Sequence, residues 1–192
     1  MPESDHAALS FLLSRRSRPA KTLTTPVPDR AALEELLTAA ARTPDHGKLE
    51  PWRFIVIEKT AMPRLADLAE TRGKVLGLDD EQIGKGRSQF DMGHLAVAVI
   101  EVHVPSPKIP ALEQTYSAGA VCLSLLNAAL AAGWGANWLS GWPSHDRVFM
   151  QEAFGLKDNE RIAGLIHIGT ETSAPPDRPR PDITAKTTWL SE

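Results

Sequence analysis

The chain lacks the residues that several common kinds of site require. It holds a single cysteine, Cys122, so neither an internal disulfide nor a thiolate metal cluster can form, and a reducing, cytoplasmic compartment is expected. Its six histidines show no HExxH or other ligand spacing, and neither a GxSxG nor a Walker A sequence occurs. These absences predict no metal site and no general acid or base among the side chains. An enzyme of this kind would take its chemistry from a cofactor.

The chain also lacks a strong excess of either charge and a continuous membrane span. The 21 basic residues nearly balance the 24 acidic ones, giving a formal charge of -3, so a nucleic-acid partner is not expected. The acidic N-terminus, with its arginines after the first apolar stretch, has the wrong order for a secretory signal. Small and polar residues interrupt the uncharged run 114–144. That run therefore predicts a helix in the core or at a subunit interface.

What is present predicts a single α+β domain over residues 1–192. Helices are predicted over residues 7–16, 29–42, 111–132 and 144–154, with two more, both exposed, inside 60–93. Strands are predicted over residues 54–58, which we expect to be buried, and over 95–104, 135–140, 162–169 and 187–190. The two kinds of element do not alternate regularly enough for a doubly wound fold, so a central sheet covered by helices is expected.

Three segments combine residue types that can hold a ligand. Residues 15–17 offer two guanidiniums and a hydroxyl suited to a phosphate, or a basic turn that complements a helix dipole. Residues 42–54 place a cation and an imidazole in a loop before a strand, or form a proline-shaped turn. Residues 133–142 combine glycines with three tryptophans. With Trp52, these indoles are predicted to line a ligand site, or else to fill a core.

Taken together, these segments resemble the nitroreductase family of flavoproteins, most closely its small, minimal YdjA-type branch of NAD(P)H nitroreductases. The resemblance runs in order over nearly the whole chain, and the ordered set is more specific than any one piece. The matching pieces are Arg15-Arg16-Ser17, Arg42-Thr43-Pro44-Asp45-His46, Pro51-Trp52-Arg53-Phe54, Glu113-Gln114, Ser117-Ala118-Gly119, Trp138-Leu139-Ser140-Gly141 and Ile168-Gly169-Thr170.

The resemblance implies an α+β fold with a central mixed β-sheet flanked by helices. It also implies a homodimer that exchanges its C-terminal extensions and holds FMN at each of two sites on the subunit interface. The implied FMN-binding residues are Arg15, Arg16 and Ser17 at the phosphate and ribityl end, with Arg178 and Arg180 as a second phosphate contact; Trp138, Leu139 and Ser140 along the isoalloxazine; and Arg42 and His46 reaching the flavin of the other subunit.

The same resemblance implies an FMN-dependent oxidoreductase that uses NAD(P)H to reduce a nitroaromatic- or quinone-like small molecule by ping-pong hydride transfer. A flavin- or nucleotide-binding module without turnover would share the same arginines and stays open at this point. So do other flavin chemistries on the same scaffold, such as reductive dehalogenation or flavin breakdown. The sequence does not separate NADH from NADPH.

Two positions depart from the pattern of the family. Leu139 stands where some relatives carry a basic residue, so only its backbone can contact the ring. Glu50 replaces the glutamine that often precedes the Pro-Trp pair. A carboxylate near a flavin disfavours the anionic reduced form, so Glu50 predicts a lower reduction potential or weaker binding of an anionic substrate.

Overall fold

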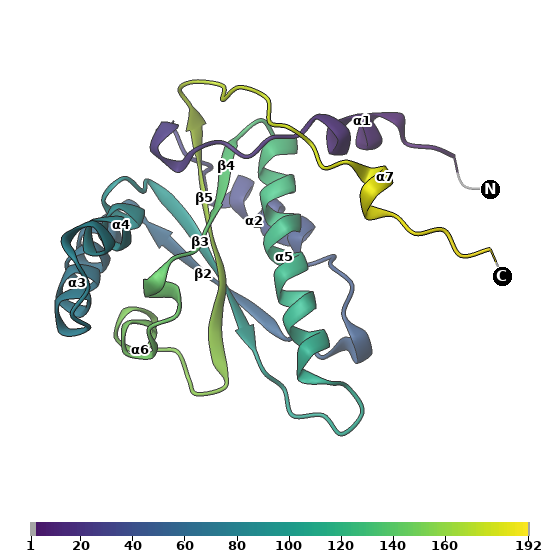
Figure 1. The fold of residues 1–192 in the computed structure, drawn as a ribbon. Helices are drawn as coiled ribbons and strands as arrows, with labels where there is room; N and C mark the ends of the chain where they lie inside the picture. The colour runs from purple at the N-terminus through teal and green to yellow at the C-terminus, as the bar shows by residue number, and fades with distance from the viewer. Residues whose placement is uncertain (1–2, 192) are drawn as a thin grey trace.

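An antiparallel sheet of five strands runs through the centre of the molecule in the computed structural model, which describes residues 3–191 (Figure 1). Its strands are β1 (Leu23–Thr24), β2 (Trp52–Glu58), β3 (Leu95–Val102), β4 (Gly135–Leu139) and β5 (Glu160–Glu171). β5 pairs with β1, β3 and β4, and β2 pairs with β3. All four pairings are antiparallel. The parallel neighbour that a mixed sheet needs is missing from residues 3–191, so the expectation of a mixed sheet is corrected to an antiparallel one.

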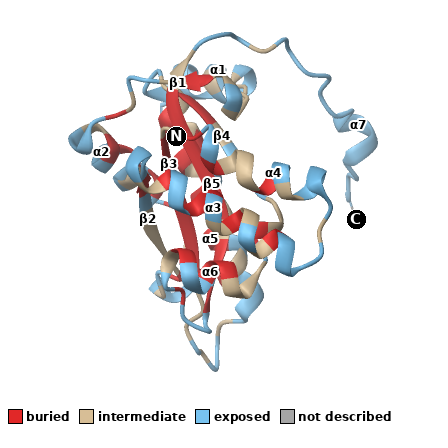
Figure 2. Cartoon of the chain, turned by 90° about the vertical axis from the view of Figure 1, so that its left-hand side faces the viewer, coloured by how far each residue is buried: buried red, intermediate tan, exposed pale blue. Residues whose placement is uncertain are grey.

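Helices cover both faces of this sheet, which confirms the predicted α+β architecture. The α-helices of the described chain are α1 (His6–Ser14), α2 (Arg30–Ala40), α3 (Met62–Val75), α4 (Asp80–Asp91), α5 (Ala111–Ala131), α6 (Arg147–Phe154) and α7 (Ile183–Lys186). α1 and α7 bury no residue and cover neither face. α3, α4 and α6 pack on the face that carries Ala96, Ala98 and Leu165, and α2 and α5 pack on the opposite face (Figure 1). Figure 2 shows that the buried residues concentrate along β3 and β5, between these two layers.

Side-chain caps set the ends of several helices close to where the sequence predicts them. Asp29 caps α2 as predicted, accepting a hydrogen bond from the Ala32 backbone at 2.9 Å. Asp146 caps α6 by accepting from the Phe149 backbone, so this helix begins three residues later than predicted. Gly155 ends α6 with a φ of 64°, a left-handed conformation that glycine adopts without strain.

The edges of the fold differ from the sequence prediction. β2 is an edge strand in which only Ile57 is buried, so the prediction of a buried strand here is wrong. The strand predicted over residues 187–190 does not form, because no neighbouring strand pairs with it in the described part of one chain. Trp189 and Leu190 are each 89% exposed. The two-residue β1 and the short α7 carry too little periodicity to be predicted.

The uncharged helix expected from the sequence is α5, and it is buried along one face only. Val121, Cys122 and Leu125 lie in the core, while Tyr116 and Leu123 are 64% and 45% exposed on the other face. Among residues 3–191, no helix is both long and apolar enough to cross a membrane. α5 therefore presents an outward face of exposed apolar side chains.

Candidate functional site

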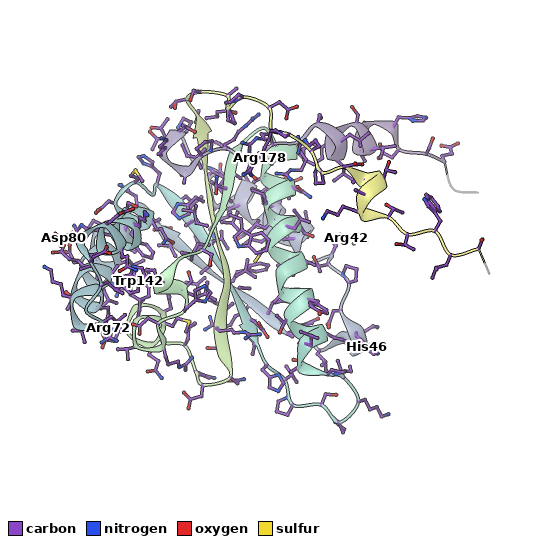
Figure 3. The ribbon with its side chains drawn as sticks, viewed as in Figure 1. Arg42, His46, Arg72, Asp80, Trp142 and Arg178 are labelled. Atoms are coloured by element: carbon purple, nitrogen blue, oxygen red, sulfur yellow. The ribbon has the colours of Figure 1, made fainter. Side chains whose placement is uncertain are left out.

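Arginines from both ends of the chain gather beyond the end of α1. The Nε atoms of Arg15 and Arg16 are buried without a hydrogen-bond partner, and Arg15 Nη2 donates to Ser17 Oγ at 3.0 Å. Burial lowers the pKa of Arg15, and repulsion from the Arg180 and Arg16 charges lowers it further. Arg178, in the same tail as Arg180, lies near the upper end of α5 (Figure 3). Clustered cations with unused N–H donors are suited to an anion such as a phosphate.

Hydrogen bonds hold this arginine segment against the outer edge of β4. The Arg18 backbone N–H donates to the Ala136 carbonyl at 2.8 Å, and Asn137 Nδ2 donates to the Arg18 carbonyl at 2.6 Å. Alternate residues of an antiparallel strand turn their backbone groups toward the same edge. Because Ala136 faces away from β5, Trp138 faces that edge as well. Backbone donors and acceptors are therefore available beside the arginines.

A cavity of about 590 Å³ lies beside the end of β4, on the side of the sheet covered by α4. This volume falls within the range of roughly 300–1,000 Å³ that is usual for small-molecule sites. The cavity brings the predicted residues Leu139, Ser140 and Trp142 together with residues that the sequence did not single out: Lys21, Lys85, Gln89, Asn137 and His167.

Two glycines give this cavity its shape. A Cβ at Gly86 would collide with the Trp142 indole, and a Cβ at Gly141 would collide with the Gln89 carboxamide. Trp142 Nε1 donates to the Gln82 carbonyl at 3.0 Å, which fixes the chain after β4 against α4. Gly86 therefore serves the packing of α4 against Trp142 beside the cavity.

The cavity wall contains buried polar atoms without partners. His167 on β5 is 3% exposed and lies directly across from Asn137 on β4. Burial lowers the pKa of His167 to about 4, so its ring is neutral near pH 7, and its Nε2 has no hydrogen-bond partner. Gln89 Oε1 is likewise buried and unpartnered. Such atoms are rare in proteins and indicate a place where a ligand can supply the missing partner.

Arg42 and His46 lie elsewhere, on the loop that packs against α5. Neither lines the cavity at the end of β4, and Figure 3 shows both on the far side of α5 from Trp142. One chain therefore does not bring all the predicted site residues together. Three side-chain bonds tie the loop to α5: Thr43 Oγ1 with Ser124 Oγ at 2.9 Å, Ser117 Oγ to the Pro44 carbonyl at 2.9 Å, and His46 Nδ1 with Glu113 Oε2 at 2.5 Å.

The backbone of this loop is strained beyond His46. Three of its residues have positive φ values: 75° at Gly47, 55° at Lys48 and 47° at Glu50. Residues other than glycine rarely adopt this left-handed backbone conformation. The Glu50 N–H donates to Asp45 Oδ2 at 2.6 Å, which helps to hold the turn. Strain of this kind persists where the surrounding contacts fix the chain, and it is frequent at functional sites.

The tryptophans do not form the single wall that the sequence suggested. Trp142 lines the cavity, whereas Trp52 and Trp134 pack into the core under α2 and α5. Trp138 is 38% exposed, and its indole occupies the space left open by Gly164. The prediction that all four line one ligand site is wrong within one chain, because Trp138 lies opposite Ile166 on the sheet face covered by α5, whereas Trp142 follows β4 and packs against α4.

Other reactive groups are scarce around the cavity. Cys122 is buried in α5, and burial raises the pKa of its thiol to about 12, so it is not a reactive thiolate near neutral pH. Within residues 3–191, no cluster of three histidine, cysteine or carboxylate side chains could hold a metal ion. The arrangement thus offers binding groups for an anion and a flat ring.

Comparisons with known proteins support this interpretation. The sequence profile of the nitroreductase family matches residues 12–170. "Putative NAD(P)H nitroreductase YdjA" from Escherichia coli strain K12 is 35% identical over 85% of this chain and 87% of its own length. A nitroreductase-like family protein from Bacillus cereus has a similar structure over the full length of both chains, with a TM-score of 0.78 and 25% identity. A structure described as an oxidoreductase containing FMN shares the fold, with a TM-score of 0.66 and 20% identity over 90% of this chain and 79% of its own.

Proposed function

The chain belongs to the nitroreductase family, and from that premise we propose that it is an FMN-dependent oxidoreductase. NAD(P)H would be the hydride donor, and a nitroaromatic- or quinone-like small molecule would be the acceptor. The oxidoreductase class follows from the family and from the names of its relatives. The cofactor, the donor and the acceptors are our proposal, and the observation that carries it is the arginine cluster beside the open edge of β4.

The arginine cluster fits the phosphate of FMN. The buried Nε donors of Arg15 and Arg16 have no partner among residues 3–191, and phosphate oxygens would satisfy them. Ser17 offers a hydroxyl beside them, and Arg178 and Arg180 bring further positive charge from the C-terminal tail. A few arginines suffice for one phosphate, even though the whole chain is slightly acidic.

The end of β4 fits the isoalloxazine ring. Leu139 and Ser140 line the cavity, and the backbone groups of Trp138 face the same open edge as those of Ala136. Bound FMN would supply hydride transfer, accepting hydride from NAD(P)H and passing it to the acceptor in a ping-pong cycle. The side chains would hold the ring, exclude water and shape access to it. We expect no general acid or base among them.

A homodimer would complete each site. Arg42 and His46 are exposed and lie away from the cavity of their own chain, so they would reach the FMN held mainly by the other subunit. The outward face of α5, with Tyr116 and Leu123, would form the centre of the interface. The exposed tail, which ends in Trp189 and Leu190, would pack on the partner as an exchanged extension. Apolar faces of this kind are usual in obligate dimers.

Two further parts of the proposal come from the sequence. We propose that residues 1–192 form a single domain and that the protein acts in the cytoplasm. The lone buried Cys122 is in keeping with a reducing compartment.

The proposal is tested by purifying the protein and recording its absorbance, its mass in solution and its response to NADH and NADPH without oxygen. We expect a yellow dimer whose colour is bleached by at least one nucleotide. Persistent colour with both nucleotides would favour a flavin-binding module without turnover. A colourless monomer that refuses added FMN would overturn the proposal.

A further inference from the structure

We propose that Gln89, Asn137 and His167 form a hydrogen-bonding site for the amide edge of a flat nitrogen heterocycle in the cavity at the end of β4. The inference rests on the proposed function, which supplies two rings with such an edge. One is the pyrimidine end of the flavin, and the other is the carboxamide of nicotinamide. Both present an N–H beside a carbonyl oxygen.

His167 is the most deeply buried member of this site. It is 3% exposed, and its Nε2 has no hydrogen-bond partner in the described part of the chain. Gly93 leaves the room that its ring needs, since a Cβ there would lie 3.2 Å from His167 Cε1. The remaining side chains on this part of the sheet face, including Ala96, Ala98 and Leu165, are apolar. A polar ring in such surroundings needs a hydrogen-bond partner from outside the chain.

Gln89 reaches the same cavity from α4. Its Oε1 is buried without a partner, and Gly141 leaves the space that the carboxamide occupies. Asn137 contributes from β4, directly across from His167. Asn137 Nδ2 donates to the Arg18 carbonyl, which fixes the orientation of the carboxamide, and its Oδ1 is an acceptor. Two strands and a helix thus bring three polar side chains to one cavity.

The chemistry of these groups matches an uncharged ligand edge. A carboxamide and a neutral imidazole carry no net charge, so they suit an amide better than a carboxylate or a phosphate. Gln89 Oε1 would accept from the ligand N–H, and His167 would donate to the neighbouring carbonyl oxygen. Two cations line the cavity as well: Lys85, which is paired with Glu81 at 2.5 Å, and Lys21. The arginine cluster and this site would therefore hold opposite ends of one ligand or parts of two.

The first test compares two flavins. The apoprotein is titrated with FMN and with FMN methylated at N3, and flavin fluorescence gives both dissociation constants. If the pyrimidine end lies in this site, the methyl group weakens binding to the parent about tenfold. In Gln89→Leu, FMN binds about tenfold more weakly than in the parent. N3 methylation then changes the affinity less than about twofold, because the substitution and the methyl group remove the same hydrogen bond.

The second test covers the other source of the edge. Anaerobic bleaching of the bound flavin is timed with NADH and with the NADH analogue that carries an acetyl group in place of the carboxamide. Suppose that N3 methylation has no effect on FMN binding to the parent. If the parent is then bleached at different rates by the two nucleotides, and Gln89→Leu is bleached at the same rate by both, the bound edge is the carboxamide of nicotinamide. A parent that binds FMN but shows no Gln89-dependent discrimination in either test overturns the inference alone. A parent that binds no FMN overturns the proposed function together with the inference.

Two controls separate ligand binding from folding. Gln151→Leu, an exposed position on α6, should leave both dissociation constants unchanged. Removing a buried polar atom that has no partner should not destabilise the apoprotein. The thermal midpoint of Gln89→Leu should therefore equal or exceed that of the parent, and a midpoint well below it would assign the side chain a structural role. His167→Gln, which keeps a hydrogen-bonding group, should bind FMN more tightly than His167→Leu.

Discussion

Two regions of the molecule carry polar groups of opposite kinds. On the sheet face covered by α4, Gln89 and His167 line a cavity through buried, uncharged atoms that have no partner among the described residues. On the loop that packs against α5, Arg42 is exposed, and the exposed ring of His46 is tied to Glu113. Buried neutral groups suit a ring that enters a fixed cavity, whereas exposed polar groups suit contacts made when two chains assemble. In the proposed dimer, one chain would therefore hold two half-sites that face different ligand molecules.

Among these tests, disrupting the proposed dimer should have the largest effect on flavin binding. A charge placed on the outward face of α5, as in Leu123→Glu, would be buried without a partner in the proposed dimer. We expect a monomer in sedimentation or light-scattering measurements, with loss of most bound flavin. Leu76→Glu, at an exposed position that ends α3, should stay dimeric and yellow. A Leu123→Glu protein that remains a flavin-bound dimer would show that α5 is not the interface.

Removing the phosphate contacts should come next. Arg15→Ala with Arg16→Ala deletes two charge-assisted contacts, so FMN should bind about a hundredfold more weakly. Riboflavin has no phosphate, and its affinity should change little. Fluorescence titration of both flavins measures the difference. Arg30→Ala, an exposed arginine paired with Glu34 on α2, is the matched control. Equal losses for both flavins would argue against a phosphate site.

The buried His167 should make the stability of the folded chain depend on pH. Burial lowers the pKa of His167 to about 4 from 6.5, so between these values the unfolded chain binds a proton that the folded chain does not. The free energy of unfolding should therefore fall by about 3 kcal/mol as the pH drops from about 6.5 to about 4. Urea unfolding of the apoprotein measures this, and His167→Gln should lose that part of the slope. Identical slopes would mean that His167 can be protonated in the folded chain.

The smallest effect should come from the strained loop. Glu50 is exposed beside His46 and would bring its negative charge near the flavin of the other subunit. Glu50→Gln should raise the midpoint potential of the bound flavin by about 10–20 mV. Glu58→Gln, at the exposed end of β2, should leave the potential where it is. Spectroelectrochemical titration compares the two, and an unchanged potential in Glu50→Gln would remove Glu50 from the flavin site.

The sequence predicted those parts of the site that stand out from their neighbours. Arg15 and Arg16 are charged residues just past an apolar helix, and His46 lies in a loop marked by proline and glycine. Gln89 and His167 do not stand out in this way. His167 falls in an apolar run that predicts only a strand, and it becomes a cavity residue through the β4–β5 register and the packing of α4. The sequence offered one signal for His167 as a site residue, namely a single histidine within an otherwise apolar strand.

The same limit applies to the fold. Helices and central strands follow from local periodicity and caps, such as Asp29 before α2. Which strand lies at the edge of a sheet depends on how the strands pair. The exposure of β2 and the antiparallel order of the sheet could therefore not be predicted from the residues of any single segment. Trp189 and Leu190 have the residue types of a strand, but a strand forms only where a neighbour pairs with it.

The most direct measurement of the shared site combines two variants in one dimer. One chain carries Arg15→Ala and Arg16→Ala, and the other carries Arg42→Ala and His46→Ala. Each variant alone should bind little FMN. Co-expressed under separate tags and purified as the mixed dimer, they recreate one intact site from the unaltered halves. We predict one FMN per mixed dimer, and a mixed dimer that binds no more FMN than either variant alone would contradict the shared site.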